Sequence, residues 1–180
     1  MNPDLRDLTE KAKAGDARAF GQLYETVYTD LYHFALYRLG NPEEAEDAVQ
    51  ETVLEAFRGI EGLKKPEAFR SWIFTILTAR CNRHIAELIR QRGQTPLEDS
   101  GLSAGDFSSQ SDTACRLREA IGALPEEDRQ LVLLSVVGGF SGKEIAEILG
   151  RPGGTLRSRL HRTLKKLRTT LSDIETDETP

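Results

Sequence analysis

The sequence predicts an all-α protein of two small helical domains joined by a flexible linker, with a helix-turn-helix in the second domain. Three observations lead to this prediction. Apolar residues recur at helical spacing along most of the chain, residues 93–113 show no period, and two helix signals near the C-terminus are separated by a Gly/Pro turn. The predicted boundaries are 1–92 for the first domain, 93–113 for the linker, 114–172 for the second domain and 173–180 for an acidic tail.

The composition fits a soluble, cytoplasmic protein. A length of 180 residues with 38% hydrophobic content is enough for two small cores. Only two cysteines, Cys81 and Cys115, are present, which argues against a disulfide framework. We find no signal peptide and no apolar run near the roughly 20 residues of a membrane span. The net charge of −5 is unusual for a nucleic-acid binder, but the acids lie outside one basic segment.

The first domain begins with a polar helix or frayed segment that ends near Gly15. The next helix has a face of apolar and aromatic residues at helical spacing, namely Phe20, Leu23, Tyr24, Val27, Leu31 and Phe34. Gly40 ends this helix. Asn41 followed by Pro42 predicts the cap and first turn of another helix, because Asn caps well and Pro fits the first helical position.

The helix from Pro42 to about Phe57 combines an apolar face with an acidic one. Six acids and no Lys or Arg lie between Glu43 and Glu55. Four residues at helical spacing form what we call the acidic strip: Asp47, Gln50, Glu51 and Leu54. This strip is unsuited to DNA phosphates and suits a basic partner protein, although a solvated helix face explains it equally well from these residues alone.

After a loop-like connection, a helix from Phe69 to Arg92 is apolar in its first half and basic in its second. Rings followed by arginines suit melted nucleic acid, where bases stack on the rings and phosphates meet the cations. The candidate residues for this contact are Trp72, Arg80, Arg83 and Arg90. For Trp72, a place in the core is the better interpretation.

The linker follows, because residues 93–113 are rich in Ser, Gly and Asp and contain no Lys or Arg. Beyond a short helix and a second one starting at Pro125, Ser141 and Glu144 form a capping-box pattern that begins a further helix. The turn Gly150–Gly154 then interrupts the pattern. The last helix, from about Thr155, carries a leucine stripe: Leu156, Leu160, Leu164, Leu167 and Leu171.

The other face of this last helix is basic, and no acid lies between Arg151 and Ser172. Two helices joined in this way match a helix-turn-helix, whose second helix enters the DNA major groove. The residues that could reach base edges and phosphates are Thr155, Arg157, Ser158, His161 and Arg162, with Lys165, Lys166 and Arg168 closer to the backbone. Arg159 lies nearer the leucine stripe, so we expect it to support the fold or a phosphate contact.

The sequence gives no sign of an enzyme, a cofactor or a metal site. The three histidines lie in separate predicted helices, and residues 150–155 lack the lysine and preceding strand of a phosphate-binding loop. Cys81 and His84 are one turn apart, but two further ligands for a metal are missing from the sequence pattern.

Four segments together resemble the small, extracytoplasmic-function type of bacterial RNA polymerase sigma factor. They are AEDAVQETVLEAF, FRSWIFTIL, LPEEDRQLVLLSVVGGFSGKEIAEIL and GGTLRSRLHRTLKKL, in this order and with a linker between the second and third. The resemblance implies that the acidic strip binds the clamp helices of the largest polymerase subunit. It also implies that residues 58–92 capture unpaired bases of the −10 promoter element and that the helix-turn-helix reads the −35 element. The polymerase flap and an anti-sigma protein are further implied partners.

The chain departs from the family pattern at two positions. An Asn common in the family is replaced by Ala79, and an acid is replaced by Arg83. The −10 specificity is therefore left open. Two alternatives are a simple helix-turn-helix regulator, which would have no use for the acidic strip, and a sigma-like mimic that sequesters an anti-sigma protein. The intact basic helix argues against the mimic.

Overall fold

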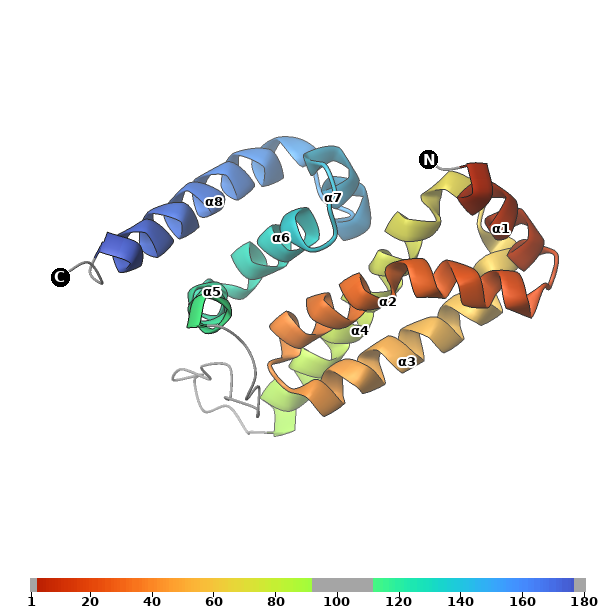
Figure 1. The fold of residues 1–180 in the computed structure, drawn as a ribbon, viewed down its shortest axis with the longest axis horizontal. Coiled ribbons are helices and arrows are strands. Elements are labelled where there is room, and N and C mark those ends of the chain that lie inside the picture. The colour runs from red at the N-terminus through yellow and green to blue at the C-terminus, as the bar shows by residue number, and fades with distance from the viewer. Residues whose placement is uncertain (1–2, 92–111, 177–180) are drawn as a thin grey trace.

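The computed structural model describes residues 3–91 and 112–176, and every regular element in these ranges is a helix (Figure 1). The N-terminal domain contains α1 (Pro3–Lys13), α2 (Ala17–Leu39), α3 (Pro42–Gly59) and α4 (Phe69–Gln91), with 3-10 turns η1 (Ile60–Gly62) and η2 (Pro66–Ala68) before α4. The C-terminal domain contains α5 (Asp112–Gly122), α6 (Glu126–Val136), α7 (Gly142–Leu149) and α8 (Gly153–Thr176). The predicted all-α class is confirmed.

Two helices extend into segments that the sequence pattern predicted as linker and tail. Helix α5 begins at Asp112, inside the predicted linker, and α8 continues through residues 173–176, inside the predicted tail. Both stretches are polar, but neither contains a Pro or Gly that would stop a helix. The rest of the linker and tail, residues 93–111 and 177–180, lies outside the described residues.

The connection between α2 and α3 forms as its residues predict. Gly40 has a φ of 74°, in the left-handed region, and its N–H donates to the Leu36 carbonyl to close α2. The Asn41 side chain then accepts hydrogen bonds from the N–H groups of Glu43 at 2.8 Å and Glu44 at 3.2 Å. This tight turn makes α2 and α3 antiparallel neighbours.

The core of the N-terminal domain lies between α2, α3 and α4. Its fully buried large side chains come from all three helices and include Leu23, Leu31, Phe34, Val49, Ile73, Phe74 and Leu77. The rings of Phe34 and Phe74 meet edge to face with centroids 5.7 Å apart, a favourable geometry for buried aromatics. The face predicted as core on α2 is therefore core, except that Tyr24 is only half-buried.

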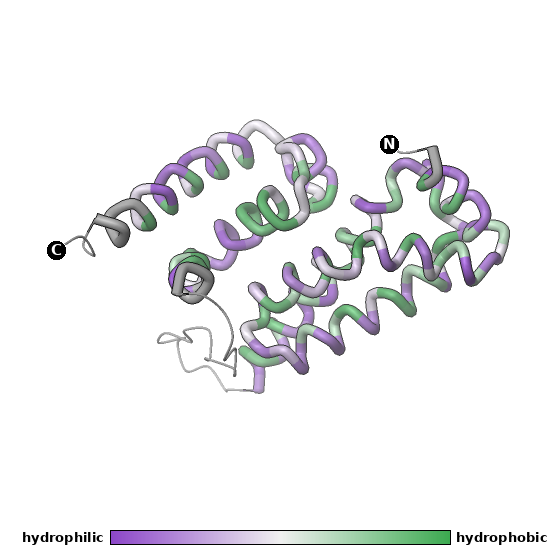
Figure 2. Tube along the Cα trace, viewed as in Figure 1, coloured by the Kyte–Doolittle hydropathy of each residue, from purple (hydrophilic) through white to green (hydrophobic). Residues whose placement is uncertain are grey.

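In the C-terminal domain, α6 forms the centre against which α7 and α8 pack. Figure 2 shows α6 apolar over much of its length, whereas α8 alternates between apolar and hydrophilic residues. Leu131, Val132, Leu133 and Leu134 of α6 are buried. The leucine stripe of α8 faces this core, with Leu156 and Leu167 buried and the other three leucines half-buried.

The two domains are in contact in this structure, which the sequence pattern did not predict. The Phe74 and Phe140 rings meet edge to face at 4.9 Å. The Arg70 guanidinium lies over both rings and donates from Nη2 to the Gly138 carbonyl at 2.9 Å and to Asp30 at 2.8 Å. Contacts of α2 and α4 with α6 and α7 thus hold the domains side by side (Figure 1).

A second polar contact joins the domains at Arg38 of α2. Its side chain is 1% exposed, donates to the Asn82 amide oxygen at 2.8 Å and is paired with Glu126 of α6. Glu126 also lies 3.6 Å from Arg129, so two arginines share one carboxylate. Among the described residues, Nε and Nη1 of Arg38 and Nε of Arg129 have no hydrogen-bond partner, which makes this contact energetically imperfect.

Candidate nucleic-acid and protein interfaces

The basic face of α8 belongs to a helix-turn-helix whose helix ends are fixed by local hydrogen bonds and a glycine. The predicted capping box is present, since the Ser141 N–H donates to the Glu144 carboxylate at 2.8 Å and the Glu144 N–H donates to Ser141 Oγ. The Ser141 hydroxyl also donates to this carboxylate, at 2.7 Å, and the hydroxyl bond first and the Ser141 N–H bond second lower the pKa of Glu144. Gly150, with a φ of 61°, ends α7 in the left-handed region, and α8 starts at Gly153, two residues earlier than predicted.

All the residues predicted to read DNA are exposed on α8. They are Thr155, Arg157, Ser158, His161, Arg162 and Lys165. Because the leucine stripe holds the opposite face against α6, these side chains point away from the core. The helix therefore presents a cationic surface one helix wide, the shape that fits a major groove.

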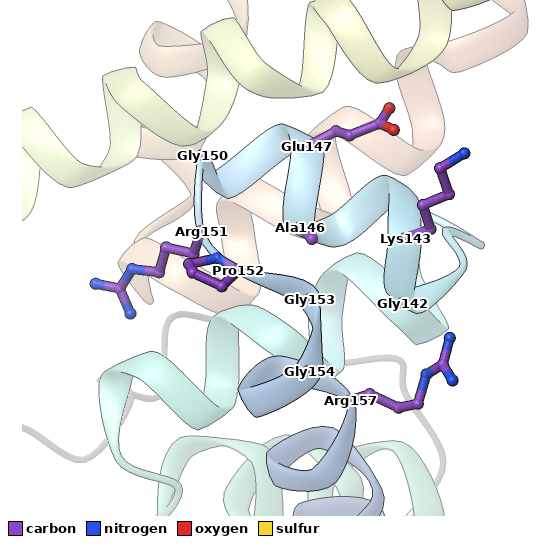
Figure 3. A pocket seen from close by; sticks show the side chains of 10 residues that line it. All are labelled: Gly142, Lys143, Ala146, Glu147, Gly150, Arg151, Pro152, Gly153, Gly154 and Arg157. Atoms are coloured by element: carbon purple, nitrogen blue, oxygen red, sulfur yellow. The ribbon is translucent and has the colours of Figure 1, made fainter.

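A pocket of about 720 Å³ lies beside the start of this helix, between α7 and α8. Figure 3 shows Lys143 of α7 and Arg157 of α8 extending on the same side of it, and Arg151 of the turn on the opposite side. Lys143 and Arg151 were not among the residues predicted from the sequence to contact DNA. Their positions in the first turn of α7 and in the turn before the basic helix could have indicated them as candidates.

Arg159 is directed inward from the basic face, as its place near the leucine stripe predicted. It pairs with Asp128 and Glu127 at the start of α6. Arg151 also reaches Glu127, at 3.3 Å. Hydrogen bonds from Arg151 and Arg159 hold the pKa of the Glu127 carboxyl below its usual range. These pairs fix α8 to α6 and leave the outer face of α8 exposed.

The acidic strip lies on the exposed side of α3. Its four members, Asp47, Gln50, Glu51 and Leu54, are all solvent-exposed, and Leu54 is an unusually exposed apolar side chain at 54%. The stripe beside the strip is core, with Ala45, Ala48, Val49, Thr52 and Ala56 buried. Figure 1 places α3 and α8 on opposite sides of the molecule, so the acidic and basic faces do not meet.

The four α4 candidates do not form one surface. Arg80 turns towards α3, where it binds Glu51 at 2.7 Å and Glu55, and these bonds, that with Glu55 first, raise its pKa. Trp72 is half-buried, and its ring lies over Gly59, where an added Cβ would be 3.5 Å away. Arg83 is exposed, and Arg90 is exposed but paired with Glu87 at 3.0 Å.

The interpretation of Trp72 as a core residue therefore agrees with its packing, and Arg80 belongs to the edge of the acidic strip. The sequence spacing grouped Arg80 with the other arginines of α4, because spacing alone does not show which neighbouring helix the Arg80 side chain faces. Within the described ranges no group of three or more His, Cys, Asp or Glu side chains could hold a metal ion. No helix in those ranges is long and apolar enough to cross a bilayer.

Two family models match the two domains. Residues 23–91 match sigma-70 region 2, and residues 116–167 match sigma-70 region 4. The chain is 31% identical over 163 residues to the ECF RNA polymerase sigma factor SigM of Mycobacterium tuberculosis, covering 91% of this chain and 82% of that protein. It is also 28% identical to the ECF RNA polymerase sigma factor SigW of Bacillus subtilis, and the match covers 97% of this chain and 100% of SigW.

Solved structures show the same fold. The sigma factor RpoE of Bartonella quintana, crystallised with the anti-sigma factor NepR, aligns with a TM-score of 0.73 at 25% identity, over 87% of this chain and 98% of that one. CnrH, solved with the cytosolic domain of CnrY, aligns with a TM-score of 0.67 at 22% identity, over 98% of this chain and 99% of that one. Both alignments extend across the two helical domains.

Proposed function

We propose that the two charged surfaces of this chain bind different partners, because the chain belongs to the extracytoplasmic-function type of the sigma-70 family, whose members direct transcription initiation. The N-terminal domain binds core RNA polymerase through the acidic strip of α3. The C-terminal domain reads the −35 element through α8, and the exposed part of α4 faces the −10 element. The protein acts in the cytoplasm, where polymerase and promoter DNA are found.

The observation that carries this proposal is the separation of charge between two faces. A protein that only bound DNA would gain nothing from an exposed acidic strip that includes an exposed leucine, because DNA phosphates repel carboxylates. A basic protein surface is attracted to the acids and can bury Leu54. The opposite side of the molecule carries the acid-free basic face of α8, which suits phosphates and base edges.

At the −35 element, Arg157, Ser158, His161 and Arg162 are the proposed base readers, and Lys165 with Thr155 contacts the backbone. Lys143 extends the phosphate-binding surface to the side of the pocket beside α8. At the −10 element the proposed contacts reduce to Arg83 and Arg90, because Arg80 is engaged with α3 and Trp72 is half-buried. The polymerase flap is the proposed partner for the C-terminal domain.

An anti-sigma protein is a further proposed partner. The sigma factor RpoE was solved with the anti-sigma factor NepR, and CnrH was solved with the cytosolic domain of CnrY. Such a partner would act on the arrangement in which the two domains are in contact through Arg38 and Arg70, here called the closed arrangement.

The experiment that tests the proposal is run-off transcription with core polymerase and this protein on a library of promoter fragments, with sequencing of the transcript starts. We expect starts that share two upstream elements. Asp47→Arg should abolish these transcripts, because it places a cation in the acidic strip, while the C-terminal domain still binds the −35 element. An absence of specific starts with folded wild-type protein, or normal core binding by Asp47→Arg, would contradict the proposal.

A further inference from the structure

The contact between the two domains has more buried hydrogen-bond donors than acceptors. Among the described residues, six buried side-chain nitrogen or oxygen atoms have no hydrogen-bond partner, and five of them belong to four residues at this contact. They are Nε and Nη1 of Arg38, Oγ1 of Thr78, Nε of Arg129 and Nε2 of Gln130, and we call these four residues the donor cluster. The four nitrogens can only donate. Because buried donors without acceptors cost free energy, the cluster is suited to an additional acceptor.

The members of the donor cluster are placed around Arg38. The Arg38 side chain, which is 1% exposed, donates to Asn82 of α4 at 2.8 Å and pairs with Glu126 of α6. Thr78 lies one turn before Asn82, and Gln130 lies one turn after Glu126. Each is therefore on the same side of its helix as a residue that contacts Arg38. Three helices from two domains thus direct polar groups towards one buried guanidinium.

The donor cluster also carries a positive charge that its protein partners do not balance. Glu126 pairs with Arg38 and lies 3.6 Å from Arg129, so one carboxylate serves two guanidinium groups. Burial lowers the pKa of Arg129, Glu126 opposes this shift, and the charge of the nearby Arg38 adds to it. Arginine does not lose its proton in proteins, so neither group escapes the repulsion by becoming neutral. A buried charge of this kind requires a negative partner.

We propose that a small monovalent anion, with chloride as the simplest example, binds in the donor cluster when the two domains close. One negative charge balances the second guanidinium, and the anion accepts hydrogen bonds from several N–H groups at once. The donor atoms have almost no solvent-accessible area in the closed arrangement, so the anion enters while the domains are apart and is enclosed when they meet. An anion that binds only the closed arrangement stabilises it relative to the open one. The site uses none of the residues that we assign to polymerase or DNA.

The test counts closed and open molecules of the full chain by single-molecule energy transfer. Dyes are attached at Glu25→Cys and Lys166→Cys, both exposed positions, with Cys115 replaced by Ser and the buried Cys81 retained. Potassium glutamate is then replaced by potassium chloride at constant ionic strength, because the glutamate anion has the same charge but is too large to be enclosed. We expect chloride to raise the ratio of closed to open molecules roughly fivefold, with saturation. The same ratio in both salts would overturn the proposal.

Two substitutions of Gln130 separate a bound anion from a general effect of salt on charged surfaces. Gln130→Glu keeps the shape of the side chain and places a carboxylate among the donors. This variant should therefore be as closed in glutamate as the wild type is in chloride, and chloride should change its ratio by less than about twofold. Gln130→Leu removes the amide donor but leaves the pairing of Glu126 intact, and its response to chloride should fall.

Gln22→Glu, which makes the same change at an exposed site of α2, is the matched control and should respond to chloride like the wild type. Circular dichroism of each variant checks that its helices are retained. If Gln130→Glu opens the domains, added negative charge is unfavourable in the cluster and the proposal is wrong. It is also wrong if Gln130→Glu and Gln130→Leu both keep the full response to chloride, because the salt then acts elsewhere on the protein.

Discussion

The reactivity of the Cys81 thiol is determined by its burial and by the charged groups around it. It is fully buried in α4, and burial raises its pKa to about 11, despite the opposing effect of the nearby Arg38 guanidinium. The thiolate is the nucleophilic form of cysteine, and it is scarce at neutral pH when the pKa is this high. Cys81 is therefore a packing residue, unsuited to sensing oxidants.

We predict that Cys81 resists alkylation in the folded protein. Iodoacetamide at neutral pH should leave the peptide containing Cys81 unmodified, as measured by peptide mass mapping. The same peptide should react fully in denaturant, which serves as the control. Rapid modification of Cys81 without denaturant would show that α4 opens far more readily than its burial indicates.

Ser141 gives a second prediction at this scale. Ser141→Ala should lower the free energy of unfolding by about 1 kcal/mol, because it removes the cap of α7. The pKa of Glu144 is lowered in the folded state, so its share of the stability is present above the ordinary carboxyl pKa. That share is lost as the pH falls through the folded pKa. Urea unfolding at neutral and acidic pH measures both effects, and the gap between wild type and variant should narrow in acid.

Among the elements, α8 carries arginines that point in two different directions. Arg157 and Arg162 are exposed, whereas Arg159 is paired with the carboxylates of α6. The periodicity of the leucine stripe was enough to predict this difference, because it fixes which side of the helix is buried. It could not predict Arg80, since the direction of an arginine between two helices depends on how those helices pack.

The prediction for α8 is a contrast between neighbouring arginines. Arg157→Ala or Arg162→Ala should reduce discrimination between the −35 element and unrelated DNA by roughly 1–3 kcal/mol without changing the thermal stability. Arg159→Ala should instead lower the stability of the C-terminal domain. Binding titrations on matched and mismatched duplexes, paired with thermal melts, measure both. Equal effects of Arg159→Ala and Arg157→Ala on discrimination would contradict this assignment.

The helices themselves were mostly predictable, and their contacts across domains were not. Caps and glycines marked the ends of α2, α3 and α7 in the sequence, because those signals are local. The contact of Arg70 with the Gly138 carbonyl joins residues that are 68 positions apart, and no periodicity reports on it. The same applies to Arg38 and Glu126, whose partnership depends on the placement of whole domains.

At the scale of the molecule, the closed arrangement is compact compared with the distance between the two promoter elements. The −10 and −35 elements are centred about 25 base pairs apart, which is roughly 85 Å at about 3.4 Å per base pair. Helix α8, with 24 residues, is about 36 Å long, and its domain lies directly against the other. We infer that the contact at Arg38 and Arg70 opens when both elements are bound.

We predict that Glu126→Gln shifts the protein towards the open arrangement. The change leaves Arg38 and Arg129 without their shared carboxylate and should raise the ratio of open to closed molecules by roughly tenfold. Energy transfer between dyes at positions 25 and 166, with Cys115 replaced by Ser, reports on the domain distance. Glu119→Gln, at an exposed site of α5, is the control with the same loss of charge. Unchanged transfer in Glu126→Gln would show that the salt bridge does not hold the domains together.

Gly138 packs closely within the C-terminal domain and also takes part in the contact between the two domains. A Cβ at this position would lie 2.6 Å from both the Leu134 carbonyl oxygen and the Phe140 ring, while the Gly138 carbonyl accepts the Arg70 hydrogen bonds. Any larger residue would displace the ring that Phe74 packs against. In a random mutagenesis selection for hyperactive alleles, position 138 should therefore recur, because one substitution there can loosen the domain contact without altering a single polymerase-binding or DNA-binding side chain.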